Sequence, residues 1–391
     1  MACAGLPSAR AAETFDAIVI GVGGVGSAAL FHTAARGARV LGLDRFPPGH
    51  DRGSSHGHTR IIRQAYFEHP HYVPLLRRTY ELWHDLEARC GRRLLFETGL
   101  VQIGPPAGEV VAGVRASAAE HGLEVEDWSA ADAARRLPGF RIRPGHEAVF
   151  ERRAGYLLVE DCVRAHVGHA LRLGAELRVG ETVRSWRPEG AGVVVETDRG
   201  QYAAARLIIA AGAWAGSLLA SLHIGLRVLR KPLFWLWPEG DVYRADRGCP
   251  AFLFDLPEGC FYGFPQIDER GVKVAEHSGG AAVDDPLAVD RSFDPAELAR
   301  VTTFTGECLP SLSAECLDSS VCLYTMSPDG HFIVDRHPQW PQVAFAAGLS
   351  GHGFKFTGLL GEVLCQLAFD GRTDAPIEFL SLARFGPREA I

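Results

Sequence analysis

A glycine-rich turn near the start of the chain has the spacing of a dinucleotide-binding site. Gly21, Gly23 and Gly26 follow the apolar run 15–20 and precede an alanine-rich stretch that extends to Ala35. The first glycine permits a tight turn, the second lets the backbone approach a pyrophosphate, and the third allows close packing of a helix on a strand. A helix N-terminus also favours an anion through its free N–H groups and its dipole. The turn therefore predicts a site for an adenine dinucleotide.

The elements around this turn are typical of such a site. Residues 15–20 predict a strand, and the stretch that ends at Ala35 predicts a helix. Arg39–Asp44 predicts a second strand, and Asp44 lies roughly 20 residues after the first glycine, where its carboxylate can accept hydrogen bonds from a ribose. Glycine clusters also occur in ordinary turns, but the combination favours the dinucleotide. The turn alone leaves NAD and FAD open.

The chain beyond Asp44 favours FAD. Residues 45–63 form a loop rich in Gly, His, Arg and Pro, whereas a nicotinamide-binding fold would continue with a regular second half of strands and helices. A second glycine-rich turn, Gly348–Gly353, follows the predicted strand Val343–Ala347 and precedes a helix predicted from about Phe354 to Asp370. Because the two turns lie far apart in the sequence, we expect a discontinuous cofactor domain.

Length and composition define the class of protein. With 391 residues the chain exceeds the roughly 250–300 residues of a single core, so we expect two domains. Hydrophobic residues make up 47% and charged residues 22%, which argues against long disordered or coiled-coil segments. The 40 basic and 47 acidic residues give a net charge of −7, which offers no electrostatic basis for binding nucleic acid or acidic membranes. A small molecule is therefore the expected partner.

Signals for export, membrane insertion and metal binding are weak. The first fifteen residues hold no continuous apolar segment, and no later stretch reaches the roughly 20 apolar residues of a membrane span, so we expect a soluble cytoplasmic protein. The nine cysteines include no C-x-x-C pair, which argues against a disulfide framework and a zinc ribbon. No Asp or Glu lies at ligand spacing beside His56 and His58, and no metal is predicted there or at His277 and His352.

The remaining patterns predict how these motifs are positioned. Apolar residues at helical spacing predict helices over His71–Cys90, Val110–His121 and Asp161–Leu173. Alternating or apolar runs predict strands over Gly192–Thr197, Gly200–Ala204, Arg206–Ala211, Leu226–Trp237 and Ala251–Val274. We expect Glu97–Phe150 to be an inserted segment with one strand, one helix and loops, and the aromatic runs after residue 226 to form a mostly antiparallel sheet.

Three longer motifs resemble one known family. Ser54–Tyr66, Val321–Thr325 and Gly348–Phe356 are similar to segments of monomeric sarcosine oxidase and N-methyl-tryptophan oxidase, and the resemblance extends from about Phe15 to Phe385. Arg230 and Lys231 before Trp235, together with the segment 273–280, resemble the N-methyl-tryptophan member more closely than the sarcosine member.

The resemblance implies a fold and a reaction. The fold is mixed α/β, with a discontinuous FAD-binding domain of the glutathione-reductase type over 1–90, 151–222 and 323–391. The substrate domain is a large mixed, mostly antiparallel sheet over 91–150 and 223–322. The implied reaction is FAD-dependent oxidation of a secondary amino acid to an imine, which hydrolyses, while O₂ is reduced to H₂O₂. The family is also expected to be monomeric and to attach FAD covalently, here through Cys322.

The resemblance further assigns roles to individual residues. Arg63 would bind the substrate carboxylate as a bidentate fork and Lys355 as a point charge, both being residues that suit an anion. Lys273 would activate dioxygen, Arg60 would be a second cation near the flavin, and His277 would lie on the substrate side. Phe261 and Tyr324 are further substrate-binding candidates. Aromatic residues near Phe261 could line a pocket for a bulky side chain, although such residues on sheet strands are more often part of the core; the set is Trp235, Trp237, Phe261, Tyr262 and Phe264. The expected cofactor-binding residues are Gly21, Gly23, Gly26, Asp44, Arg45, Ser54, His56, Thr59, Val183, Gly212, Trp214, Cys322, Gly351, His352, Gly353 and Lys355.

Two residues depart from the family pattern, and two alternatives remain. Ser55 and His58 stand where the family commonly has a histidine and an aspartate, which puts the substrate preference and the covalent attachment in question. The first alternative is an FAD enzyme that uses another electron acceptor or acts on a cyclic or glycated amine such as pipecolate. The second is a flavin-binding protein whose catalytic site has decayed.

Overall fold

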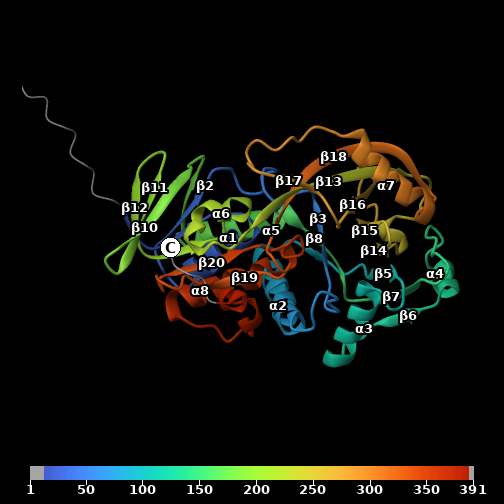
Figure 1. Ribbon diagram of the computed structural model, residues 1–391, viewed down its shortest axis with the longest axis horizontal. Coiled ribbons are helices and arrows are strands. Elements are labelled where there is room, and N and C mark those ends of the chain that lie inside the picture. The colour runs from blue at the N-terminus through green and yellow to red at the C-terminus, as the bar shows by residue number, and fades with distance from the viewer. Residues whose placement is uncertain (1–12, 387–391) are drawn as a thin grey trace, which may run out of the picture.

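A parallel sheet forms the core of one end of the molecule. The computed structural model describes residues 13–386 and shows two large sheets at opposite ends of the long axis (Figure 1). In the first sheet, neighbouring strands are parallel in the order β9 (Glu176–Val179), β2 (Val40–Asp44), β1 (Glu13–Ile20), β12 (Gln201–Ile209) and β20 (Val343–Ala347). β19 (Ile333–Arg336) pairs antiparallel with β20, and the hairpin of β10 (Val183–Glu189) and β11 (Gly192–Thr197) extends from β12.

Helices α1 (Gly24–Ala35) and α8 (Thr357–Asp370) pack on this sheet. Helix α5 (Val159–Arg172) packs on α1, and α2 (Tyr72–Cys90) packs on α8. Ten of the twelve residues of α1 are buried, which explains why its sequence is small and apolar rather than amphipathic. A Cβ atom on Gly361 of α8 would lie only 2.5 Å from the backbone of Ala28. This close crossing fixes the two glycine-rich turns, one before each helix, relative to each other.

A larger sheet forms the other end. Its strands lie in the order β17 (Ala281–Val283), β13 (Arg227–Pro238), β16 (Val272–Glu276), β15 (Gly259–Phe264), β14 (Ala251–Leu256), β5 (Leu100–Gly104), β7 (Glu147–Glu151) and β6 (Glu126–Trp128). The long strand β18 (Leu312–Met326) pairs antiparallel with β13, and the two run together from the centre of the molecule to its far end (Figure 1). Within the described residues, the pair of β14 and β5 is parallel and the other pairs of this sheet are antiparallel.

Smaller elements complete the structure. Helices α3 (Glu109–His121), α4 (Ala130–Arg136) and α7 (Pro295–Cys308) pack on the larger sheet. β3 (Thr59–Ile62), β8 (Gly155–Leu158) and β4 (Leu95–Phe96) form a three-stranded sheet between the two ends. The remaining helices are the short α6 (Ala215–Leu218) and single 3₁₀ turns, which include η4 (Phe354–Phe356), η5 (Glu378–Leu380) and η6 (Leu382–Phe385).

The structure confirms the predicted mixed α/β class and most predicted elements, with two corrections. The segment Glu97–Phe150 holds β6, α4 and β7 where loops were expected after its first helix. The predicted strands Gly200–Ala204 and Arg206–Ala211 are one strand, β12, whose first half pairs with β11 and whose second half pairs with β20. Because β12 changes partner along its length, its buried and exposed residues do not alternate regularly. The sequence pattern therefore predicted two strands instead of one.

The structure bears on part of the expectation about membranes. No helix within residues 13–386 is both long and apolar enough to cross a bilayer. Most of the segment 1–15, on which the absence of an export signal was argued, lies outside the described residues.

Candidate active site

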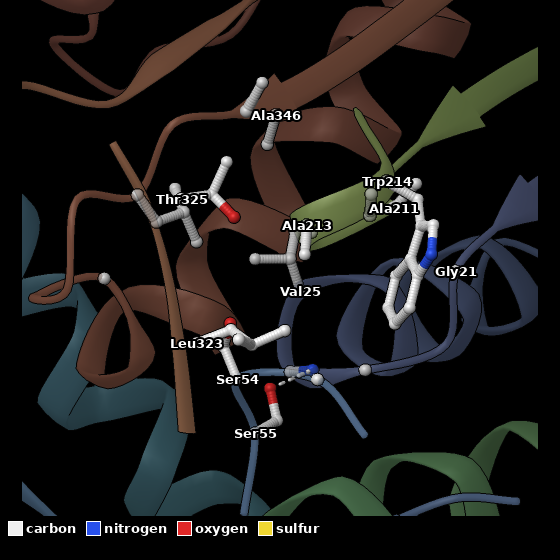
Figure 2. Close-up of a pocket in the computed structure, with 18 of the residues that line it drawn as sticks. Gly21, Val25, Ser54, Ser55, Ala211, Ala213, Trp214, Leu323, Thr325 and Ala346 are labelled. Atoms are coloured by element: carbon white, nitrogen blue, oxygen red, sulfur yellow. Dashed lines mark hydrogen bonds between the residues drawn. The ribbon is translucent and has the colours of Figure 1, made fainter. Parts of the chain in front are cut away.

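A long cavity of about 1310 Å³, part of it open to solvent, runs along the carboxyl ends of β1, β2 and β12. Figure 2 shows Gly21, Trp214 and Ala211 at one side of this cavity and Leu323 and Thr325 at another, with the loop residues Ser54 and Ser55 below them. Ten expected cofactor-binding residues line the cavity: Gly21, Gly23, Asp44, Arg45, Ser54, Val183, Gly212, Trp214, Gly351 and Gly353. Ligands of open α/β sheets bind outside the carboxyl ends of the strands, as this cavity is placed.

The three glycines of the first turn meet the demands expected of each. Gly21 has φ +83°, which an L-residue rarely adopts, and a Cβ atom there would lie 2.6 Å from the carbonyl oxygen of Ala210. A Cβ on Gly26 would lie 1.6 Å from the carbonyl oxygen of Gly21, so this glycine permits the close contact of α1 with the turn but does not line the cavity. Gly23 lines the cavity, and the atom nearest to a Cβ added there would be Ser55 Oγ, at 3.6 Å.

Unsatisfied buried donors in the cavity wall fit an adenine dinucleotide. Within the described residues, the buried atoms Arg45 Nη1, Trp214 Nε1, Thr325 Oγ1 and Thr357 Oγ1 have no hydrogen-bond partner, and all four residues line the cavity. Buried polar atoms are normally paired, so four unpaired ones around one cavity indicate a polar ligand. The carboxylate of Asp44 accepts from the N–H groups of Val22 at 2.6 Å and Phe46 at 2.9 Å, which fixes its position in the wall.

The loop at 53–60 connects this cavity to Cys322. Arg60 lines the cavity and donates through Nη2 to Cys322 Sγ at 3.0 Å and to the carbonyl of Ser54 at 3.1 Å. Cys322 lies in β18, is buried, and does not itself line the cavity, whereas its neighbour Leu323 does. His56 is also buried behind the loop, where Nε2 contacts the carbonyl of Gly53 at 3.1 Å.

A second cavity of about 490 Å³, again partly open to solvent, adjoins the first. Arg60, Tyr324, Gly351 and Phe354 line both cavities. The second cavity is also lined by Ile61, Arg63, Phe67, Glu68, Leu253, Tyr262, His277, His352 and Lys355. Arg63 and Lys355, which the sequence assigned to one anion, therefore face a common cavity, although β3 precedes Arg63 and η4 contains Lys355, nearly three hundred residues later.

Arg63 is held by an anion and by two aromatic rings. Its Nη2 donates to Glu68 Oε2 at 2.5 Å, and its guanidinium carbon lies 4.4 Å from the ring centres of both Tyr66 and Phe67. Burial alone would raise the pKa of Glu68, but Arg63, His352 and Lys355 outweigh it and bring the pKa down to about 2. Arg63 Nε is buried and has no partner within the described residues.

Lys355 belongs to a hydrogen-bonded chain with Tyr66 and His352. Its Nζ donates to the carbonyl of His352 at 2.7 Å and contacts the hydroxyl of Tyr66 at 3.3 Å. Burial lowers the pKa of His352 to about 4, so its ring is neutral, and Nε2 can donate to the carbonyl of Gly330 at 3.0 Å. Nδ1 then accepts from the Tyr66 hydroxyl at 2.6 Å. Burial lowers the pKa of Lys355 well below its usual value.

Two tyrosines and a neutral histidine form the opposite wall. The Tyr324 hydroxyl lies 3.2 Å from His277 Nδ1, and burial lowers the pKa of His277 to about 3. Tyr262 lines the cavity, but the predicted residue Phe261 does not: it stacks on Phe304 of α7 with ring centres 4.5 Å apart. Consecutive residues of a strand face opposite sides of the sheet, so Phe261 faces away from the cavity, contrary to the prediction, and Tyr262 lines it instead.

Lys273 and Thr59 lie behind the loop rather than in either cavity wall. Lys273 Nζ donates to the carbonyls of Gly57 at 2.6 Å and Thr59 at 2.8 Å and is 3.5 Å from the Thr59 hydroxyl. Burial lowers the pKa of Lys273 well below its usual value. The carboxylate of Glu160 accepts from Gly57 N–H at 2.7 Å and from His58 N–H at 3.2 Å, so it fixes the same loop from the other side.

The sequence missed some residues of the site and misjudged others. Glu68 and Glu160 belong to no sequence motif. Their roles become visible only from the residues that they contact in the fold. Ser55, a departure from the family pattern, accepts from Gly24 N–H at 3.0 Å and so anchors the loop to the first turn (Figure 2). His58, the other departure, contacts Arg270: its Nε2 atom lies 2.8 Å from Arg270 Nη2. It lines neither cavity.

Comparison with known proteins gives the family. Residues 16–367 match the family described as FAD dependent oxidoreductase. A monomeric sarcosine oxidase from Streptomyces avermitilis is 42% identical over 370 residues, which cover 93% of this chain and 96% of that protein. An N-methyl-L-tryptophan oxidase from Yersinia pestis is 35% identical over 374 residues, which cover 95% of this chain and 99% of that protein.

Solved structures share the fold over almost the whole chain. NikD, an unusual amino acid oxidase essential for nikkomycin biosynthesis, gives a TM-score of 0.84 at 27% identity and covers 94% of this chain and 97% of its own. A glycine oxidase from Geobacillus kaustophilus gives a TM-score of 0.77 at 20% identity and covers 95% of this chain and 99% of its own. The comparisons confirm the resemblance found in the sequence, and the chain belongs to the FAD-dependent oxidoreductases, among relatives named as amine-oxidising enzymes.

Proposed function

We propose that this enzyme oxidises a secondary, N-methylated amino acid to an imine, which hydrolyses to an amino acid and an aldehyde, while O₂ is reduced to H₂O₂. The observation that carries the proposal is that Arg63 and Lys355 face one small cavity adjoining the larger cavity. The names of the relatives, sarcosine oxidase and N-methyl-L-tryptophan oxidase, point to the same class of substrate. FAD, when bound, supplies the two-electron oxidation of the C–N bond and the transfer of electrons to O₂.

The substrate carboxylate is proposed to bind between Arg63 and Lys355. Arg63 Nε is buried and has no hydrogen-bond partner among residues 13–386, and a carboxylate can satisfy it. The rings of Tyr66 and Phe67 hold the guanidinium in place, and the carbonyl of His352 orients Lys355. The amine would then lie toward the residues shared by the two cavities, among them Tyr324. Tyr262, Phe67 and Leu253 leave an aromatic and apolar space for a side chain.

The cofactor is proposed to be FAD held covalently by Cys322. Arg60 donates to Cys322 Sγ, and a cation beside a sulfur stabilises negative charge on it, which a nucleophilic sulfur needs. Acid precipitation tests the link: yellow colour should stay on the polypeptide and be lost in C322A. Free flavin in the supernatant of fully loaded protein would exclude the link.

Lys273 is proposed to be the cation that assists the reaction with O₂, with Arg60 as the second cation near the flavin. Both are buried or half-buried and come from different elements, β16 and β3, to the same loop. A fixed cation near the point where superoxide-like charge develops lowers the barrier. The loop carbonyls of Gly57 and Thr59 hold the ammonium of Lys273 in place.

The proposal extends to the organisation of the chain. The strands of the parallel sheet lie in the segments 1–90, 151–222 and 323–391, and nearly all of the larger sheet lies in 91–150 and 223–322, which supports the two domains drawn from the sequence. β18 and β7 cross these boundaries by a few residues. The name of a relative, monomeric sarcosine oxidase, supports a monomer, and a cytoplasmic location is part of the proposal.

A substrate screen tests the proposed reaction. Peroxide release should be measured in air with sarcosine, N-methyl-tryptophan, pipecolate and a glycated amino acid, each at several concentrations. We expect release with at least one N-methyl amino acid and formaldehyde in equal amount. Peroxide from pipecolate or the glycated substrate alone would replace the proposal with the cyclic or glycated alternative, and a bound flavin that no amine reduces would indicate the decayed protein.

A further inference from the structure

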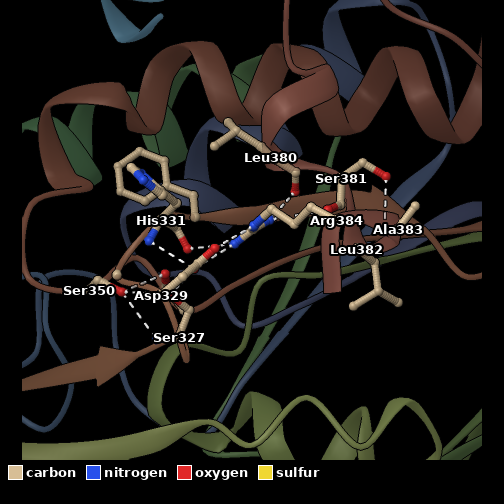
Figure 3. A network of polar contacts seen from close by, with 12 residues as sticks. Ser327, Asp329, His331, Ser350, Leu380, Ser381, Leu382, Ala383 and Arg384 are labelled. Carbon is tan, nitrogen blue, oxygen red and sulfur yellow. Dashed lines mark hydrogen bonds and ion pairs between the residues drawn. The ribbon is translucent and has the colours of Figure 1, made fainter. Parts of the chain in front are cut away.

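A polar network links the C-terminal segment to the second glycine-rich turn. Figure 3 shows Arg384 of η6 lying against Asp329, with Ser327 and Ser350 beyond it. The guanidinium donates to both Asp329 oxygens, at 2.8 and 3.0 Å, and to the carbonyls of His331, Leu380 and Ser381 at 3.0, 2.8 and 3.2 Å. All five N–H groups of Arg384 are therefore used.

The network continues from Asp329 to the cavity wall. Because the Asp329 carboxylate can only accept, Ser327 Oγ donates to it, at 3.2 Å. The backbone N–H of Ser327 donates to Ser350 Oγ at 3.1 Å, and Ser350 Oγ donates to the carbonyl of Gly348 at 3.0 Å. Ser350 and Gly348 line the larger cavity.

The turn needs such support because its backbone is strained. Ser350 has φ +47°, a left-handed conformation that a non-glycine residue adopts only at a cost. Its hydroxyl is buried and receives the Ser327 N–H, while its own N–H donates to the carbonyl of Thr325 at 2.9 Å. The structure around a strained residue must hold it in place, and here the holding contacts lead outward to Asp329 and Arg384.

We propose that Asp329 and Arg384 are positioning residues, which hold the turn Gly348–Gly353 in the geometry that binds the flavin end of the cofactor. The inference rests on the proposed function, because it takes the flavin to lie on this turn. It adds that the last helical turn of the described chain, which lines neither cavity, controls how tightly the cofactor is held. Neither Asp329 nor Arg384 is among the residues that line the two cavities.

The alternative is a purely structural role, in which Arg384 only anchors the C-terminal segment. Arg36 provides a matched control, since it forms a bidentate pair with Asp370, at 2.7 Å for both bonds, at the C-terminal ends of α1 and α8, whereas the glycine-rich turns precede these helices. R36M removes a pair of the same kind without a path to the turn. S327A breaks the path in its middle and leaves the bonds between Arg384 and Asp329 in place.

The experiment measures FAD binding and hydrogen exchange in a C322S background, where the cofactor is free to dissociate. We expect R384M, D329N and S327A to raise the Kd for FAD about tenfold and to speed exchange of the amides at 348–353, and R36M to change the Kd less than twofold. R384K replaces R384M if the latter does not fold.

Two results would overturn the inference in different ways. If FAD protects the amides at 348–353 in the parent, but R384M and S327A leave its Kd within twofold, then Arg384 anchors the C-terminal segment alone and the proposed cofactor position survives. If FAD does not protect these amides in the parent, the cofactor position is wrong and the inference fails with it.

Discussion

Arg63 donates to Glu68 at 2.5 Å inside the cavity that it shares with Lys355. The guanidinium thus has one anion already at Nη2 and an unpaired, buried Nε. A substrate carboxylate would be the second anion in this group, and Lys355 a second cation. The carboxylate would meet Arg63 at the side that Glu68 leaves unpaired.

Loss of Arg63 should affect substrates with a carboxylate and spare those without one. We expect R63M to lower kcat/KM for an N-methyl amino acid by about 100-fold or more, because a buried charge pair with one partner removed costs roughly 2–5 kcal/mol. The corresponding N-methylamine, without the carboxylate, should lose less than about threefold. R63K should fall between, since lysine keeps the charge but loses the fork.

R93M is the matched control for this variant. Arg93 lies over the ring of Phe96 at 4.5 Å, as Arg63 lies over Tyr66, but it lines neither cavity. An equal loss for both substrates in R63M, or the same loss in R93M, would contradict the assignment of Arg63 to the carboxylate.

The charge of Glu68 should make the stability of the enzyme depend on pH. The pKa of Glu68 is about 2 in the fold against about 4.5 for a free glutamate, so its contribution is present above pH 4.5 and is lost as the pH falls from 4.5 to 2. The shift corresponds to up to about 3 kcal/mol. E68Q should unfold at lower urea concentration at pH 7, and its difference from the parent should shrink below pH 4.5. A difference that stays constant down to pH 3 would argue against an ionised Glu68.

Buried histidines should weaken the fold in mild acid. Burial lowers the pKa of His166 to about 3 and that of His32 to about 4, whereas an unfolded histidine titrates near 6.5. The unfolded state therefore binds protons first, and each such histidine should remove about 1.4 kcal/mol of unfolding free energy between pH 7.5 and 5.5.

Urea unfolding of H166Q at both pH values tests this effect. The loss of stability on acidification should be smaller than in the parent by about the contribution of one histidine. An unchanged loss in H166Q would mean that His166 is charged in the fold.

Lys273 should act on the oxygen reaction and not on substrate oxidation. In K273M we expect the reaction of reduced flavin with O₂ to slow by at least about 100-fold, the cost of a lost electrostatic contact of this kind, while anaerobic reduction changes less than tenfold. Because burial lowers the pKa of Lys273, the oxygen rate of the parent should fall with rising pH below the usual titration range of lysine. K273R, which stays charged, should lack that fall. Equal slowing of both half-reactions in K273M would contradict the role.

Local motifs were predictable from the sequence, whereas contacts across the fold were not. The turn at Gly21–Gly26 and the turn at Gly348–Gly353 are set by residues within a few positions, so spacing identifies them. Glu68 acquires its role only because Arg63 and Lys355 meet beside it, and no local pattern encodes that meeting. Ser55 was only a departure from the family pattern in the sequence, but its hydroxyl accepts a hydrogen bond from Gly24 N–H.

The error at Phe261 has a different origin. Both faces of the strand β15 are buried, so Phe261 and Tyr262 are both aromatic residues in a buried strand, and the sequence does not distinguish them. Which face meets the cavity depends on α7, whose Phe304 covers Phe261. The packing of a helix more than thirty residues later decides the face, and alternation along the strand cannot reveal it.

Anaerobic mixing with flavin absorbance as the signal tests the central claim most directly. The parent and an R63M/K355M double variant are each mixed with an N-methyl amino acid and with the corresponding N-methylamine. We predict that the amino acid bleaches the parent rapidly and that the amine bleaches it slowly. Neither substrate should bleach the double variant faster than the amine bleaches the parent. Bleaching of the double variant by the amino acid at the parent's rate, or no bleaching of the parent by any secondary amino acid, would contradict the account.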